Sequence, residues 1–208
     1  YTQLVAANLT NPDDRFVVNV MSGVVLSDGT TLTPQQVTWW AGGALAGAQY
    51  NESLTYARYP GAADVSPRLT NAQFEAALEA GQLVLQAQDG VVKIEQDINS
   101  LVTYTGETGE IFRKNRVVRL CSTIANDLYR EFSENFIGVV NNNEAGRSRF
   151  KSVIVGYLLD IQANQGIQNF SADDVTVQAG QDIDAVVVDI AIQPVDAVEK
   201  IYMSIQLQ

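Results

Sequence analysis

The sequence predicts an α+β fold, in which an antiparallel or mixed sheet packs with a long antiparallel helical hairpin and the chain ends in a C-terminal strand. Two observations predict it. Apolar residues recur at helical spacing from about residue 111 to 139 and again over residues 150–161, and the short polar run at 141–143 predicts antiparallel helices. The pattern then changes to a period of two over residues 185–192 and 199–207, as in strands, and in the second segment an apolar face lies opposite a polar face.

Two shorter helices are predicted from their N-terminal signals. Thr33 can cap a helix whose first residue is Pro34, and Gln36 completes a capping box. The same arrangement returns at Thr70 and Gln73. We therefore expect one helix from Pro34 to about residue 48 and a second helix that begins after Thr70.

Strands are expected on either side of these two helices. The segments that favour them are residues 16–20, 23–26, 83–88 and 91–96. The last two flank Asp89 and Gly90, a dipeptide that favours a type I′ hairpin turn because both of its positions need positive φ. Residues 50–67 show little periodicity, so we expect a loop there.

The composition excludes several classes of function. The chain has no histidine, and Cys121 is its single cysteine, so Ser-His-Asp and Cys-His mechanisms and an internal disulfide are excluded. The net charge of -11 would repel phosphate backbones, so no nucleic acid partner is expected. No apolar run reaches the roughly 18 to 20 residues of a membrane helix, so no membrane insertion is expected.

Candidates for catalytic or metal chemistry are weak. Ser148 and Lys151 have the S-x-x-K spacing of a serine nucleophile and its base, but the accompanying S-D-N and K-T-G elements are missing. Five aspartates without calcium-loop spacing are interpreted as solvated turn carboxylates, namely Asp173, Asp174, Asp182, Asp184 and Asp189. We therefore assign no catalytic, cofactor-binding or metal-binding residue, and we expect neither a cofactor nor enzyme activity.

A basic cluster stands at the start of the long helix. Its members are Arg113, Lys114, Arg116 and Arg119. Cations at this end oppose the helix dipole, at a cost of about 0.3–1 kcal/mol each when exposed, so compensating carboxylates are expected nearby. These carboxylates are either intramolecular, such as Glu107 and Glu110, or part of an acidic patch on a neighbouring subunit. The residues leave both alternatives open.

The expected last strand has two different faces. The apolar face consists of Ile201, Met203, Ile205 and Leu207, and the polar face of Tyr202, Ser204 and Gln206. Such a strand either completes the sheet of its own chain or pairs through its edge with another chain. Both alternatives stay open.

Three stretches, in order, carry a resemblance to a known family. Residues 93–103 read K-I-E-Q-D-I-N-S-L-V-T, residues 112–148 contain F-R-K-N-R-V-V-R and an N-N-N turn, and residues 194–202 read P-V-D-A-V-E-K-I-Y. They resemble contractile phage tail sheath proteins, a family that includes the sheaths of R-type bacteriocins and related injection systems. The resemblance covers about residues 91–208, and the helix expected at 33–49 is also sheath-like.

The resemblance implies a structural subunit of a contractile tail. Many copies would form a helical or ring-stacked homopolymer around a tail tube and contract to drive the tube through the host envelope. The C-terminal strand of one copy would join the sheet of a neighbour, and an N-terminal arm from another neighbour would complete the mesh. Further implied partners are the tail tube protein and the baseplate and tail-terminator proteins, in a virion tail assembled in the host bacterial cytoplasm.

The expected subunit interface combines the basic cluster with the last strand. Its residues are Arg113, Lys114, Arg116, Arg119, Ile201, Tyr202, Met203, Ile205 and Leu207. The resemblance also divides the chain into residues 1–90, the C-terminal portion of a central sheath domain, and residues 91–208, the sheath C-terminal domain. Because the chain begins with Tyr1 rather than methionine, we expect the earlier part of the central domain to be missing and this piece alone not to assemble.

Two alternatives to a sheath subunit are kept. One is a hydrolase domain that uses carboxylates. The other is a different structural protein of a virion tail or baseplate. The long helical hairpin argues against a tail tube protein, which should be mostly β.

Overall fold

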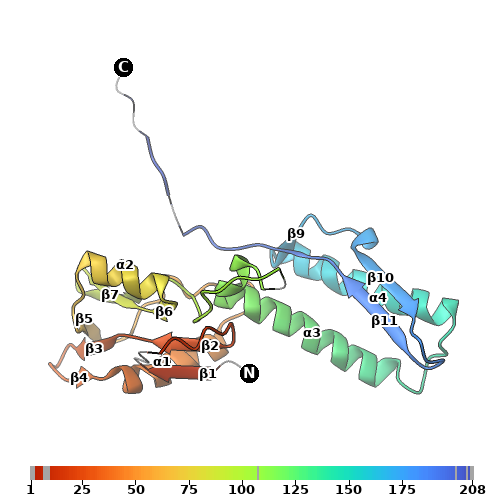
Figure 1. Cartoon of the computed structure of the whole chain (residues 1–208), viewed down its shortest axis with the longest axis horizontal. Coiled ribbons are helices and arrows are strands. Elements are labelled where there is room, and N and C mark those ends of the chain that lie inside the picture. Colours follow the sequence, from red (N-terminus) through yellow and green to blue (C-terminus); the bar gives the residue numbers. More distant parts are fainter. Residues whose placement is uncertain (1–2, 7–9, 107, 200, 205, 207–208) are drawn as a thin grey trace. The chain divides into compact units, whose positions relative to one another are not determined.

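The computed structural model describes residues 3–6, 10–106, 108–199, 201–204 and 206 (Figure 1). The chain has a mixed α+β fold, as predicted, with four α-helices and several small sheets in its described part. It divides into two compact units. Tyr1–Val118 and Asp196–Gln208 form unit 1, and Arg119–Val195 form unit 2. The boundary expected at residue 90 stays a prediction.

Unit 1 contains two three-stranded sheets and a hairpin. The parallel sheet has the order β1 (Gln3–Ala6), β2 (Val17–Val20), β6 (Gln82–Leu83). The antiparallel sheet has the order β4 (Thr31–Leu32), β3 (Gly23–Leu26), β5 (Ala62–Ser66). The hairpin pairs β7 (Leu85–Gln88) with β8 (Val91–Ile94). All four residues of β2 are buried, so this strand shows no alternation of apolar and polar residues.

Helix α1 (Pro34–Gly47) contributes to the core of unit 1. Its capping box at Thr33 and Gln36 is present, which confirms the predicted start. The buried core combines residues of α1 with residues of the strands and the following loops: Val18, Val20, Val24, Val37, Ala41, Leu45, Leu54, Ala62, Leu83, Leu85, Val92 and Ile94. Burial of these apolar side chains is the main favourable contribution to the folding of unit 1.

Helix α2 (Asn71–Glu79) begins with the predicted capping box at Thr70 and Gln73. Gly81 follows its end with φ +72°, a conformation that favours glycine. A Cβ atom at this position would lie 2.8 Å from the carbonyl oxygen of Ser100. The close approach of residue 100 therefore requires glycine here.

The strand expected at residues 83–88 is divided in the structure. Leu83 pairs with Val20 in the parallel sheet, whereas Leu85 pairs with Ile94 in the hairpin. The two halves therefore belong to different sheets, which an unbroken apolar pattern does not reveal. The hairpin turn itself is confirmed, because residues 89 and 90 have φ of 53° and 74°.

The prediction of a loop over residues 50–67 is wrong for its last part. Residues 62–66 form β5, in which Val65 lies opposite Val24 of β3. The partner strand comes from about 40 positions earlier in the chain, and β5 itself shows no clear alternation of apolar and polar residues. Its pairing therefore leaves no local signal.

Two long helices form the predicted antiparallel hairpin. Helix α3 (Asn115–Asn135), most of which belongs to unit 2, is preceded by a 3₁₀ turn over Glu110–Arg113. Helix α4 (Glu144–Ala163) begins after Asn143, whose side chain accepts a hydrogen bond of 2.9 Å from the Gly146 N–H. The helix expected to extend to residue 139 ends at 135, before a turn with positive φ at Gly138.

Two small sheets complete unit 2. Strand β10 (Val175–Ala179) packs on α4 and pairs antiparallel with β11 (Val186–Ile190), which confirms the expected strand at 185–192. Strand β9 (Ile167–Gln168) pairs with β12 (Gln193–Pro194). Residues 201–204 and 206, where the last strand was expected, belong to no strand because no neighbouring strand pairs with them. Ile205 and Leu207 lie outside the described residues.

Candidate assembly interface

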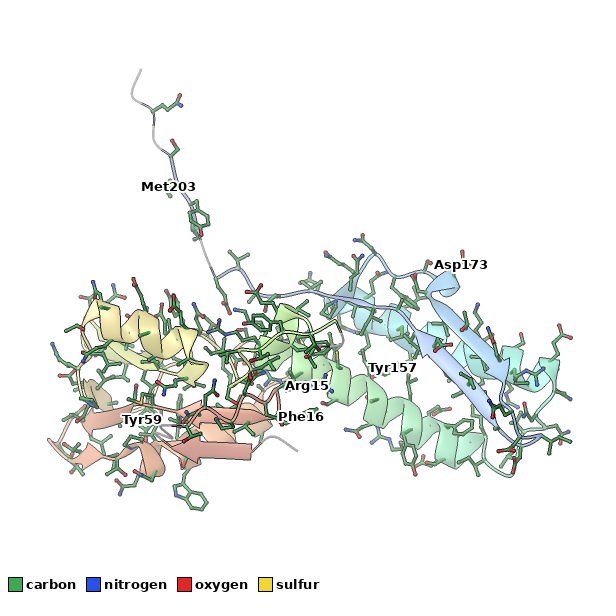
Figure 2. The ribbon with its side chains drawn as sticks, viewed as in Figure 1. Arg15, Phe16, Tyr59, Tyr157, Asp173 and Met203 are labelled. Atoms are coloured by element: carbon green, nitrogen blue, oxygen red, sulfur yellow. The ribbon has the colours of Figure 1, made fainter. Side chains whose placement is uncertain are left out.

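The described end of the chain is exposed. We call residues 200–208 the C-terminal arm, of which the structure describes 201–204 and 206. The side chains of Ile201, Tyr202 and Met203 are 80%, 91% and 79% exposed. Figure 2 shows Met203 on this extended segment, which is part of no helix or sheet. Three consecutive large side chains therefore take no part in the core of the chain.

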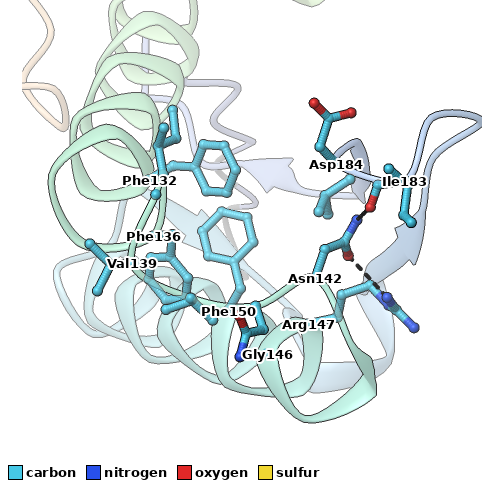
Figure 3. Close-up of a pocket in the computed structure, with 14 residues that line it drawn as sticks. Phe132, Phe136, Val139, Asn142, Gly146, Arg147, Phe150, Ile183 and Asp184 are labelled. Carbon is cyan, nitrogen blue, oxygen red and sulfur yellow. Dashed lines mark hydrogen bonds between the residues drawn. The ribbon is translucent and has the colours of Figure 1, made fainter.

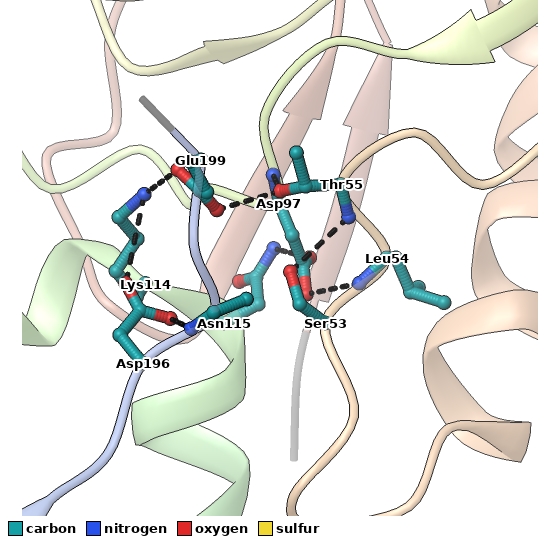
Figure 4. A network of polar contacts seen from close by, with 9 residues as sticks. Ser53, Leu54, Thr55, Asp97, Lys114, Asn115, Asp196 and Glu199 are labelled. Carbon is teal, nitrogen blue, oxygen red and sulfur yellow. Dashed lines mark hydrogen bonds and ion pairs between the residues drawn. The ribbon is translucent and has the colours of Figure 1, made fainter. Parts of the chain in front are cut away.

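The residue just before the arm is held firmly. The Glu199 carboxylate, whose side chain is only 9% exposed, forms an ion pair with the Lys114 ammonium. Its other oxygen accepts a hydrogen bond of 2.7 Å from the Thr55 hydroxyl. Lys114 also lies 3.8 Å from an oxygen of Asp196 (Figure 4). Both oxygens of Glu199 therefore have partners in unit 1.

The network continues from Thr55 to a buried carboxylate. Asp97 is 1% exposed, and its backbone N–H donates a hydrogen bond of 2.9 Å to the Thr55 hydroxyl. The Asp97 carboxylate accepts hydrogen bonds of 3.0 Å from the Leu54 N–H and 2.9 Å from the Asn115 side-chain amide. A buried carboxylate is tolerated only when it is paired in this way.

The three stretches that resemble sheath proteins meet in this network. The first supplies Asp97, the second supplies Lys114 and Asn115, and the third supplies Asp196 and Glu199. Each of these side chains forms a hydrogen bond or an ion pair with a side chain from another stretch. This pairing is a structural reason why charged and amide residues stand at these positions. The sequence does not reveal the network, because its members are far apart along the chain.

The segment after Asp97 is tied to the connection between β1 and β2. The Ser100 hydroxyl donates to the Asp14 carbonyl at 3.0 Å, and the Asp13 carboxylate accepts from the N–H groups of Val102 and Thr103 at 2.7 and 2.9 Å. Hydrogen bonds from the Thr103 side chain and from these two N–H groups hold the pKa of Asp13 below its usual value. The N-S-L-V-T run thus has an anchoring role.

Within unit 1, members of the basic cluster are engaged by the chain itself. Arg113 donates from its guanidinium to the Leu78 carbonyl at the end of α2, and Arg116 is only 7% exposed. Lys114 pairs with Asp196 and Glu199, which the sequence did not suggest as partners; of the two glutamates that it did suggest, Glu107 lies outside the described residues. Arg119, the first residue of unit 2, is half-buried. The interface role of the four cations stays a prediction.

A second carboxylate, Glu95, lies near Glu199. Burial raises the pKa of Glu95, and the negative charge of Glu199 raises it further, while Lys93 and a hydrogen bond from Gln86 act in the opposite direction. The neighbourhood of the arm base thus contains both the Lys114–Glu199 ion pair and a carboxylate that resists ionisation.

Unit 2 has an open pocket of about 630 Å³ beside its hairpin, lined by both apolar and polar residues (Figure 3). Its wall contains the rings of Phe132, Phe136 and Phe150, and on its rim Ile183 is 95% exposed. The Asn142 side chain donates to the carbonyl oxygens of Ile183 and Ala185, at 2.9 and 2.8 Å. These bonds hold the turn before β11 against the helix connection.

The residues considered for catalysis or metal binding lie in unit 2, outside the polar network around Asp97 and Glu199. Ser148 and Lys151 line a shallow open groove between α4 and β10. Asp174 accepts from the Ser171 N–H at 2.8 Å, as a turn carboxylate does. Over the residues with described positions, no group of three or more cysteines or carboxylates is arranged to hold a metal ion. The same residues include no helix long and apolar enough to cross a bilayer.

Two family models match nearly the whole chain between them. A phage tail sheath protein central domain matches residues 2–100, and a phage tail sheath C-terminal domain matches residues 107–208. The Phage-like element PBSX protein XkdK of Bacillus subtilis (strain 168) is 39% identical over 214 residues, which cover 99% of this chain and 46% of that protein.

Solved structures give the same result. A sheath tail protein of Desulfitobacterium hafniense is similar with a TM-score of 0.88 and 43% identity, over 100% of this chain and 48% of that one. The helical sheath of the anti-feeding prophage in the contracted state shares the fold, with a TM-score of 0.77 and 16% identity, over 100% of this chain and 62% of that one. The chain spans about half the length of the first two of these relatives. It belongs to the phage tail sheath protein family.

Proposed function

We propose that this chain is part of a structural subunit of a contractile tail sheath, which polymerises around a tail tube and contracts to drive the tube through a host envelope. The subunit's partners are copies of itself, the tail tube protein, and baseplate and tail-terminator proteins, in a virion tail assembled in the bacterial cytoplasm. Nucleic acid and membrane insertion have no part in this function. Membership of a family of structural proteins supports it.

The exposed arm is the observation that carries the proposal. Ile201, Tyr202 and Met203 add large, nearly fully exposed side chains to a chain with a net charge of -11. Large exposed side chains in an extended segment, with apolar residues at every second position, are typical of a strand that pairs with another chain. The arm therefore supplies the contact between copies.

The acceptor on the neighbouring copy is its β10–β11 sheet. Strand β11 pairs with β10 on one side, and no described strand pairs with its other edge. Val186 and Val188 of β11 are half-buried, whereas Val187 is 48% exposed. A strand that pairs with the open edge of β11 can therefore place its apolar side chains on the same side of the sheet as Val186 and Val188. The alternation of residues 201–207 matches this arrangement. The apolar side chains of the arm would then cover the part of the pocket that Val186 and the phenylalanine rings line.

Contraction, in this proposal, is a rearrangement of rigid subunits that stay connected by their arms. Additional burial at the contacts between subunits drives the change, at about 25 cal/mol per Å² of apolar surface. The contracted anti-feeding prophage sheath shares this fold, which is consistent with the proposal. The carboxylate hydrolase alternative receives no support from the comparisons.

Electron microscopy of the full-length protein that carries this sequence tests the proposal. We expect hollow striated tubes, and we expect them to disappear when the last eight residues are deleted. Two single substitutions provide a matched pair: Met203→Glu places a charge on the apolar face of the arm, and Ser204→Glu places the same charge on the polar face. Only Met203→Glu should prevent tube formation. Tubes from the truncated protein would overturn the proposed role of the arm.

A further inference from the structure

Side-chain exposure rises sharply between Glu199, which is bound by other residues, and Ile201. The side chain of Glu199 is 9% exposed, and Ile201 is 80% exposed. Asp196 and Glu199 both lie within ion-pair distance of Lys114. The contacts of Glu199 thus define the point at which the arm leaves the packed part of unit 1.

Glu199 is held from two directions. Lys114, just before α3, reaches one carboxylate oxygen, and Thr55, from the loop before β5, donates to the other. Thr55 is itself fixed by the Asp97 N–H at 2.9 Å. Lys114 is 23% exposed, so this ion pair is partly protected from solvent, unlike a surface pair such as Arg68–Asp64 with 76% exposure at the arginine. An ion pair that shares hydrogen bonds with a buried network restrains its residues more than an exposed one.

We propose that Thr55 and Lys114 are positioning residues for assembly, which hold Glu199 so that the C-terminal arm leaves each subunit from a fixed point. A segment whose base is fixed loses less conformational freedom when it binds, so the arm pairs with a neighbouring copy more readily. The same contacts transmit force on the arm to unit 1. The inference rests on the proposed function in one respect, namely that the arm binds a neighbouring copy.

The first test measures the arm in the 208-residue chain without assembly. Trypsin cleavage after Lys200 releases residues 201–208, and mass spectrometry follows this peptide with time. Thr55→Val removes the hydroxyl and Lys114→Met removes the charge. Each should accelerate the release about tenfold, as expected when a charge-assisted hydrogen bond no longer opposes local opening. Thr55→Ser keeps the hydroxyl and should restore the slow release.

Controls separate local release from loss of stability. Arg68→Met breaks the exposed ion pair of the same unit and should leave the release of residues 201–208 unchanged. Cleavage after Lys151 in unit 2 should also be unchanged in the Thr55 and Lys114 variants, because a merely global destabilisation would accelerate both sites. If the Thr55 and Lys114 variants are folded and release residues 201–208 at the rate of the unsubstituted chain, the proposal that Thr55 and Lys114 hold Glu199 is overturned.

The second test follows tube formation by the full-length protein. Thr55→Val and Lys114→Met should increase the lag time before tubes form about tenfold at equal protein concentration. Thr55→Ser and Arg68→Met should leave this lag time unchanged. Faster release of the arm without slower tube formation overturns the positioning role. Failure of the proposed function is distinguishable, because it appears as tubes from the protein without its last eight residues while the release experiment is unaffected.

Discussion

The Asp97 carboxylate accepts a hydrogen bond of 2.9 Å from the side-chain amide of Asn115, the first residue of α3. The two residues are 1% and 5% exposed. The backbone repeats the connection, since the Asn115 N–H donates to the Asp97 carbonyl at 3.1 Å. This pair joins the segment after β8 to the start of the long helix, and it supports the residues that hold Glu199.

Replacement of Asp97 should strongly destabilise the chain. Asp97→Ala leaves the Leu54 N–H and the Asn115 amide without their acceptor, and each buried donor left unpaired costs about 1–3 kcal/mol. We expect the free energy of unfolding, measured by denaturant titration, to fall by about 2–5 kcal/mol. Asp182→Ala, at an exposed position, is the control and should change it by less than about 0.5 kcal/mol. Equal losses in the two variants would contradict the role of the network.

The helical hairpin of unit 2 should depend on Phe150. Its ring centroid lies 4.8 Å from that of Phe132 and 4.7 Å from that of Phe136, so it joins α4 to α3. Phe150→Ala should cost about 3–5 kcal/mol, observed as an earlier loss of helical circular dichroism on denaturation. Leu159→Ala on the same helix, at 46% exposure, should cost much less. A loss below about 1 kcal/mol for Phe150→Ala would show that the two helices do not depend on this contact.

Two glycines with similar backbone angles provide a test of close packing. Gly81 has φ +72° and Gly90 has φ +74°, but only at Gly81 would a Cβ atom meet neighbouring backbone, 2.8 Å from the Ser100 oxygen. Gly90→Ala should cost about 1–2 kcal/mol from backbone strain alone. Gly81→Ala should cost clearly more, as measured by thermal denaturation. Equal losses of stability in the two variants would mean that the backbone at residue 100 can move away from a Cβ atom at position 81 without cost.

Glu95 should make the chain less stable at neutral pH. Because burial raises its pKa in the folded state, the folded chain binds this proton more tightly than the unfolded chain, so ionisation opposes folding. This cost is present above the raised pKa and disappears as the pH falls through it and below the unfolded value. Glu95→Gln should therefore raise the melting temperature at pH 8, with a difference that shrinks toward pH 4. Glu79→Gln, at an exposed position, is the control for the loss of a carboxylate.

Charge reversal in the basic cluster tests its two interpretations. If the cations faced a neighbour, Arg113→Glu, Lys114→Glu and Arg116→Glu together would weaken assembly with little change in melting temperature. Their contacts with Leu78, Asp196 and Glu199, and the burial of Arg116, lead us to expect a loss of more than about 3 kcal/mol in folding stability instead. A melting temperature unchanged by the triple substitution would favour the intermolecular alternative.

The exposure of the C-terminal arm agrees with the sequence pattern, but the contacts at its base were not predictable. The alternation of residues 201–207 indicates a strand that needs a partner, and the structure leaves the described residues of that segment exposed. No sequence rule connects Lys114 to Glu199, 85 positions later, or predicts that the ion pair involves these two residues. The only feature of the sequence that associates Lys114 with Glu199 is that both belong to stretches that resemble sheath proteins.

The sequence by itself determined where helices begin and where a tight turn occurs. The capping boxes of α1 and α2, the type I′ turn at residues 89–90 and the apolar spacing in α3 and α4 act within a few residues, so their effect is nearly independent of the rest of the chain. Only the tertiary structure decided that residues 62–66 form a strand, that residues 82–88 divide between two sheets, and that Asp97 joins Asn115. The reason is physical: extended segments and buried carboxylates take their hydrogen-bond partners from distant parts of the chain, and only folding brings those parts together.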